Sequence, residues 1–208
     1  MKRLILIVAL VVIGISLPND ATAQFDLGKA WNKLVGNDSN KTPEPTRYDK
    51  LKENAPDEAL ILGTWHYASA KVDYFGDNML AGFAIDQLDG LAQSALVDNG
   101  VKPGYFDITL NKGGIISGSV GNDTMAGEYA YAKSDASVTL TVTIDGVEVL
   151  CTGYVECRSN RLMIYLDADD IFQAYESLNV GYTDSTITLA RDVISQFDGI
   201  YVAVSFSK

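Results

Sequence analysis

The strongest constraint on the fold is a run of short alternating segments between residues 105 and 166. Apolar and polar side chains alternate with a period of two, which places them on opposite faces of a strand. Turn residues at 112–114, 121–123, 145–146 and 158–160 separate the segments. Asp145-Gly146 is a strong hairpin signal, because both positions of its turn need positive φ. The run therefore predicts antiparallel strands joined by tight turns, a meander.

One further strand is predicted on each side of this meander. Residues 61–75 are rich in aromatic and β-branched side chains, and residues 200–206 alternate as the meander does. After the first strand, apolar residues at spacings of three and four predict a helix that ends at Asn99-Gly100. Its polar residues Asp86, Asp89 and Gln93 are expected to face away from the apolar stripe. A second helical insertion is predicted before the last strand. It is a pair of helices, one beginning at Asp167 and one over 187–197, with a gap through Gly181 and Asp184 between them.

Eight apolar strands of this length need protection of their edges. Open edges pair with other chains and aggregate, whereas a closed up-and-down barrel has no edges. We therefore predict a mainly β fold, an eight-stranded antiparallel up-and-down barrel whose first and last strands pair. Helical insertions follow strand one and precede the last strand. The interior of such a barrel is just wide enough for side chains or one small ligand.

The first residues predict export. Met1-Lys2-Arg3 precedes an uncharged stretch from Leu4 to Leu17, and Ala21-Thr22-Ala23 follows. A basic start, a short apolar stretch and a small-x-small end make a secretory signal peptide, expected over residues 1–23. The stretch is shorter than the roughly 20 residues that span a membrane. Residues 24–54 are expected to hold a short helix (25–34) and a polar linker, and residues 55–208 the barrel domain. The protein is expected in the periplasm or outside the cell.

Charge and motifs narrow the function. A net charge of −11 argues against nucleic acid and anionic membranes as partners. The only histidine, His66, accompanies no catalytic motif, so we expect no enzyme. Asp167, Asp169 and Asp170 lack the spacing of a calcium loop and fall where a helix should start. Helix capping is therefore favoured over metal binding, and neither a metal nor a cofactor is expected.

The two cysteines are not expected to form a disulfide with each other, unless Gly153 marks a sharp bend. Cys151 and Cys157 lie on one predicted strand, roughly 20 Å apart at about 3.3 Å per residue. A disulfide needs Cα atoms within about 7 Å. Residues six apart on a strand share a face, so we expect two free thiols on the same side of the sheet.

Several short motifs carry a family resemblance. Gly63-Thr64-Trp65 resembles the G-x-W motif of the lipocalins, whose eight-stranded barrels bind small apolar molecules. The ordered set L-G-T-W (62–65), V-K-P-G-Y-F (101–106), T-G-Y-V (152–155) and L-D-A-D (166–169) resembles an uncharacterised lipocalin-like family of secreted Bacteroidetes proteins, over residues 55–208. The resemblance implies structural roles for Gly63 and Trp65, with Trp65 closing one barrel end. It also implies a basic side chain over that Trp, for which residues 201–208 offer only Lys208. That family has no established function to carry over.

The apolar faces of the strands give the candidate ligand-binding residues, with Tyr129 and Tyr131 included if their face is the interior. The set is Phe106, Ile108, Tyr129, Tyr131, Leu140, Val142, Ile164 and Val202. The same side chains would suit a barrel filled by its own residues. Two functions therefore stay open. One is a secreted binding protein for a small apolar or amphipathic ligand, and the other is an envelope interaction or structural protein with a filled barrel.

Overall fold

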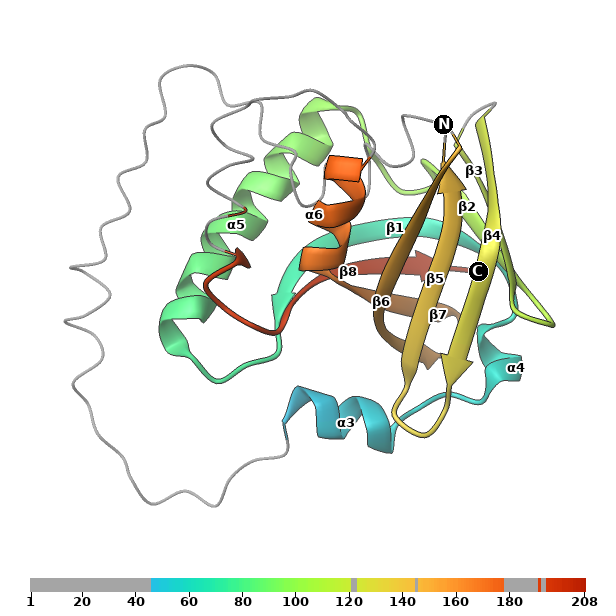
Figure 1. Cartoon of the computed structure of the whole chain (residues 1–208), viewed down its shortest axis with the longest axis horizontal. Coiled ribbons are helices and arrows are strands. Elements are labelled where there is room, and N and C mark those ends of the chain that lie inside the picture. The colour runs from blue at the N-terminus through green and yellow to red at the C-terminus, as the bar shows by residue number, and fades with distance from the viewer. Residues whose placement is uncertain (1–45, 121–122, 145, 178–190, 192–193) are drawn as a thin grey trace.

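The predicted barrel is present. The structure is a computed structural model that describes residues 46–208, apart from 121–122, 145, 178–190 and 192–193. Eight antiparallel strands form a closed barrel in chain order (Figure 1). They are β1 (Gly63–Tyr74), β2 (Asp107–Asn111), β3 (Ile115–Val120), β4 (Asp123–Ala132), β5 (Ser137–Ile144), β6 (Val147–Arg158), β7 (Arg161–Asp167) and β8 (Ile200–Ser207). The first and last strands pair from His66↔Ser207 to Tyr74↔Ile200, which confirms the predicted closure.

Four helices accompany the barrel in the described residues: α3 (Arg47–Glu53), α4 (Glu58–Ile61), α5 (Met79–Asp98) and α6 (Ala168–Ser177). The helix predicted after the first strand is α5, and it ends at Gly100 with a positive φ of 70°. The predicted cap of α6 is also present, because Asp167 Oδ1 accepts the backbone N–H of Asp169 at 2.9 Å. The predicted helix over 25–34 and most of that over 187–197 lie outside the described residues. No described helix combines the length and apolarity that a membrane span requires.

The barrel interior forms one apolar cluster. Pairing such as Trp65↔Ile108 and Ile164↔Val204 places alternate side chains of every strand on this inner face. Side chains of α5 and α6, among them Leu88 and Phe172, belong to the same cluster. The helices therefore extend the core beyond the strands.

The two ends of the barrel differ. We call the end where β1 begins and β8 finishes the Trp end, after Trp65. We call the opposite end, where β1 leads into α5 and β7 into α6, the helix end. Figure 1 shows α5 and α6 together on one side of the barrel and α4 on the other.

At the helix end, parts of β1 and β6 have no neighbouring strand on one side, and helices contact these edges. β1 pairs with β2 only over Gly63–His66, and β6 pairs with β7 only from Gly153 onward. On the exposed edge of β1, Asp89 of α5 accepts the N–H of Val72 at 2.8 Å, and Gln93 donates to the carbonyl of Ala70 at 2.6 Å. The expected position of Asp89 and Gln93, away from the apolar stripe of the helix, leaves out the contact that both side chains make with the edge of β1. The spacing of apolar residues finds the buried stripe, but it cannot reveal polar side chains that replace a strand partner.

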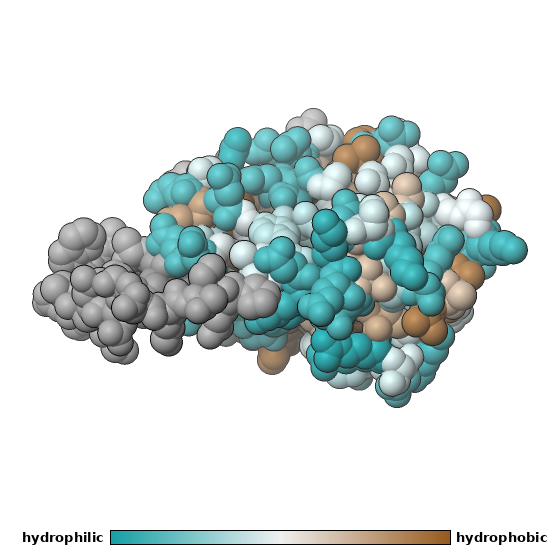
Figure 2. Space-filling model, turned by 90° about the horizontal axis from the view of Figure 1, so that it is seen from below, coloured by the Kyte–Doolittle hydropathy of each residue, from teal (hydrophilic) through white to brown (hydrophobic). Residues whose placement is uncertain are grey.

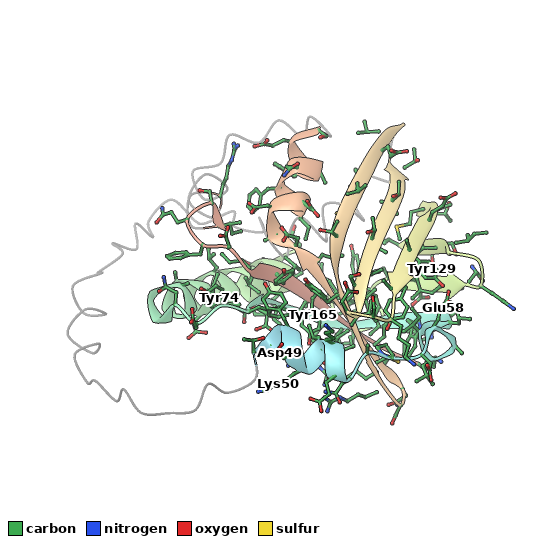
Figure 3. The ribbon with its side chains drawn as sticks, turned by 60° about the horizontal axis from the view of Figure 1, so that its bottom comes forward. Asp49, Lys50, Glu58, Tyr74, Tyr129 and Tyr165 are labelled. Carbon is green, nitrogen blue, oxygen red and sulfur yellow. The ribbon has the colours of Figure 1, made fainter. Side chains whose placement is uncertain are left out.

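The helix α3 packs on the outside of the barrel. A capping box starts it, with Thr46 and Asp49 each bonded to the other's backbone N–H. Its Leu51 joins a second apolar cluster with the outward-facing Tyr165 and Tyr201. Arg47 donates to the Tyr165 hydroxyl and lies 3.5 Å from the Glu156 carboxylate. Figure 3 shows α3 beside Tyr165, so the predicted domain boundary at residue 55 falls just after a docked helix.

Candidate ligand-binding site

The Trp end is sealed around one indole ring. Trp65 is fully buried, and its Nε1–H donates to the carbonyl of Ile61 in α4 at 2.7 Å. Lys208 Nζ lies 4.4 Å from the ring centroid, so the basic side chain implied by the resemblance is present. Gly63 has φ of 115°, and a Cβ there would lie 3.8 Å from Lys208 Cε. Because an L side chain rarely adopts this φ, glycine lets β1 begin in this position.

Tyr129 and Tyr131 face inward but turn their hydroxyls toward the Trp end. The Tyr129 hydroxyl donates to the carbonyl of Asn111 at 3.0 Å, and that of Tyr131 to the carbonyl of Pro56 at 2.7 Å. Tyr129 also lies beside Glu58 of α4 (Figure 3). Burial, reinforced by negative charge at Asp57, raises the pKa of Tyr131 to about 12. Both phenols therefore serve mainly to close this end.

One wall of the interior is tightly packed. Ile164 and Val202, on β7 and β8, are 3% and 0% exposed. Phe106 stacks on Tyr67 with ring centroids 4.8 Å apart and meets the edge of Phe206 at 5.7 Å. These side chains fill the space between β8, β1 and β2, and Ile108 joins them opposite Trp65.

The opposite wall is different. Leu140 and Val142 of β5 and Met125 of β4 face inward by register, yet each is partly exposed to solvent. The inward positions beside them, Gly118 and Gly127, carry no side chain. A Cβ at Gly127 would lie 2.2 Å from the backbone oxygen of Thr141, so close strand packing requires glycine there. Water thus reaches an apolar inner surface on β3–β5.

All eight predicted site residues belong to, or pack against, the one interior cluster, but in three places. Ile108, Tyr129 and Tyr131 lie toward the Trp end, and Phe106, Ile164 and Val202 form the packed wall. Leu140 and Val142 lie on the partly exposed wall of β4 and β5, and Tyr131 is partly exposed as well, but at the Trp end. Met125 lies on the same wall. Its inward position could have been predicted from the sequence, because it shares a face of β4 with Tyr129.

The thiols and the histidine lie apart from any recognisable reaction centre. Cys151 and Cys157 are free, as expected, and both face inward. Burial, helped by the negative charges of Asp170 and Asp167, raises the pKa of Cys151 to about 12. On the outside, His66 Nδ1 lies 2.6 Å from Asp107 Oδ1, a partner 41 residues away that sequence reasoning missed. Within the described ranges, no group of three or more His, Cys, Asp or Glu side chains is placed to hold a metal ion.

Comparison with known proteins identifies the family. Residues 40–208 match the family described as "Lipocalin-like domain (DUF4923)". Among solved structures, the chain is similar to a DUF4847 family protein from Bacteroides vulgatus ATCC 8482, with 15% sequence identity and a TM-score of 0.36, over 72% of this chain and 94% of that one. No curated protein matches it. The family match includes every strand of the barrel and confirms the predicted lipocalin-like family. The chain therefore belongs to the lipocalin-like domain family DUF4923.

Proposed function

We propose that this protein is an exported, non-catalytic binding protein that holds a small apolar or amphipathic molecule at the helix end of its barrel. The observation that carries the proposal is the partial exposure of Met125, Leu140 and Val142, which face the inside of a closed barrel. Apolar surface in water costs about 25 cal/mol per Å², and a ligand that covers it recovers this free energy.

The face of the molecule seen in Figure 2 supports an interior site. Figure 2 shows a mainly hydrophilic face on which hydrophobic side chains form only small separate areas. Proteins that dock partners through an apolar surface expose larger contiguous patches. The water-accessible apolar surface inside the barrel is therefore the better candidate for recognition.

The test is to fill the interior with a larger side chain. Leu140→Trp and Val142→Trp would occupy the water-accessible wall, whereas Thr141→Trp on the same strand faces outward and serves as the control. With an apolar fluorescent probe, we expect the two inward variants to lose at least tenfold in affinity and the control to bind like wild type. Circular dichroism and urea unfolding establish that each variant is folded.

Two results would contradict the proposal. Undiminished probe binding in folded Leu140→Trp and Val142→Trp would place the site elsewhere. No binding of apolar probes by the wild-type protein, together with a bare mass in native mass spectrometry of material from its own cells, would favour the alternative of a filled barrel that contacts other envelope proteins.

Export is part of the proposal and has its own test. The basic start, the uncharged stretch and the Ala21-Thr22-Ala23 end support cleavage after residue 23. N-terminal sequencing of the protein from the cell envelope and the medium should begin at Gln24. A chain that retains Met1 and stays in the cytoplasm would refute export.

A further inference from the structure

The barrel has an unpaired strand edge on each side of its helix end, and a helix covers each edge with a carboxylate. On one side, Asp89 of α5 accepts the N–H of Val72 on β1 at 2.8 Å. On the other side, Asp170 of α6 accepts the N–H and the hydroxyl of Thr152 on β6, both at 2.7 Å. Two helices from different parts of the chain thus use the same chemistry.

These contacts are easier to break than strand pairing. A strand ladder shares many backbone bonds that must open together, whereas each helix here holds its strand edge by the hydrogen bonds of one or two side chains, in addition to the apolar side chains that it buries in the interior cluster. Asp89 and Asp170 are partly exposed, so water can replace them at the strand amide. The helix α5 also contains Gly82 and Gly90, whose added Cβ atoms would meet nothing within 4 Å. Glycines with no packing role lower the intrinsic stability of a helix.

The covered edges border the wall that water reaches. Cys151, directly before Thr152, faces inward opposite Leu140, and Val149 on the same edge lies opposite Val142. Movement of α6 away from β6 would therefore widen access to Leu140 and Val142. Movement of α5 would open the interior beside Val72, which faces Val202 across the β1–β8 pair.

We propose that the helix end is the mouth of the ligand site and that α5 and α6 are its covers, held shut by Asp89 and Asp170. This inference rests on the proposed function, and it adds the route of access and the residues that set its rate. The two carboxylates act on the position of the helices, and contact with the ligand is not required of them.

The test compares the kinetics of probe binding in stopped flow. Asp89→Ala and Asp170→Ala should raise both the association and the dissociation rate severalfold, with the equilibrium affinity changed by less than twofold. Asp89→Asn retains an acceptor oxygen and should restore slow rates. The controls are Asp98→Ala on α5 and Gln173→Ala on α6, which remove exposed polar side chains without touching either strand edge. Amide hydrogen exchange should rise at Val72 in Asp89→Ala and at Thr152 in Asp170→Ala, and it should stay at the wild-type rate in the controls.

The possible failures are distinguishable. If exchange at Val72 and Thr152 rises but both rates stay at the wild-type values, the helices are not the covers of the mouth. If exchange does not rise, the carboxylates do not hold the helices. If wild type binds no probe, the proposed function and the mouth both fail.

Discussion

At the scale of single residues, Trp65 shows how a large amphipathic side chain is fixed inside a barrel. Its ring is fully buried, its N–H is bonded to Ile61, and the Lys208 ammonium lies over its face. A buried indole needs a partner for its N–H, and a cation over the ring adds attraction of about 0.5–1 kcal/mol at an exposed site. The sequence motif indicated the position of the ring, and the family resemblance indicated Lys208 as its cation, but only the fold supplied the carbonyl of Ile61 as the partner of the N–H.

Removal of the cation should weaken the Trp end. Lys208→Ala keeps the backbone bond from Lys208 N–H to Asn160 but loses the ammonium, so we expect a loss of about 0.5–1 kcal/mol in the free energy of unfolding. Urea unfolding followed by Trp fluorescence measures this loss. The control Lys102→Ala removes an exposed lysine elsewhere and should change little. Equal stability of Lys208→Ala and wild type would show that the contact contributes nothing.

A second prediction concerns Tyr165, whose pKa is raised to about 12 by burial. Between pH 10 and 12 the unfolded chain has released this proton while the native state keeps it. The free energy of unfolding therefore falls as pH rises through this window, and this contribution is fully present below pH 10. Tyr165→Phe should show a smaller fall between pH 9 and pH 11 in urea unfolding, with Tyr105→Phe as the control. The same fall in wild type and Tyr165→Phe would disprove the assignment.

At the scale of elements, helix and strand types were predictable, whereas helix orientation was not. Periodicity identified β1–β8, α5 and the start of α6 from the spacing of their apolar residues. It could not reveal the contacts of Asp89 and Gln93 with β1, since these depend on a strand edge that exists only after β1 and β2 diverge. Docking of α3 could not be predicted from local sequence either, because the contact between Arg47 and Tyr165 joins residues 118 apart in sequence.

The start of α6 leads to a pH prediction with an unusual sign. Burial first, and then the charges of Asp170 and Asp198, raise the pKa of Asp169. Just above pH 4 the native protein therefore still holds this proton, whereas the unfolded chain has lost it. The contribution of Asp169 to the free energy of unfolding consequently rises as pH falls from neutral. Asp169→Asn should be more stable than wild type at pH 7, and the difference should shrink toward pH 4. Melting temperatures of both proteins at pH 7, 5 and 4 measure it, and a constant difference would contradict the prediction.

At the scale of the whole molecule, the fold was predictable because many weak signals agree. Turn residues, alternation and the cost of open edges all point to one closed barrel. For the site, the sequence predicted only which side chains of the strands point to the interior. Parity brought the eight candidate residues to the interior, but it cannot distinguish Ile164 on the packed wall from Leu140 on the wall that water reaches. That distinction depends on how β3–β5 and the helices pack around each side chain, which alternation along a single strand does not describe.

The charge of the helix end predicts which ligands are accepted. Both helices that cover the proposed mouth carry acidic side chains, Asp86 and Asp89 on α5 and Asp169 and Asp170 on α6. Like charges repel, so an anionic head group should be disfavoured there. Among probes with a twelve-carbon tail, we expect the amine and the alcohol to bind more tightly than the carboxylate, by several-fold at low salt. Titration calorimetry at two salt concentrations measures this order, and tighter binding of the carboxylate would refute it.

Closure between β1 and β8 has a consequence for how the chain reaches its native state. Residues 63–74 must find residues 200–207, the most distant pair of strands in the sequence. Contacts between distant residues form slowly, because a long loop must close before they stabilise anything. The hairpins from β2 to β7 join neighbours, so they can form earlier while the chain is being synthesised. The barrel closes only when β8 pairs with both β1 and β7, and until then the edges of those two strands are open to pairing with other chains.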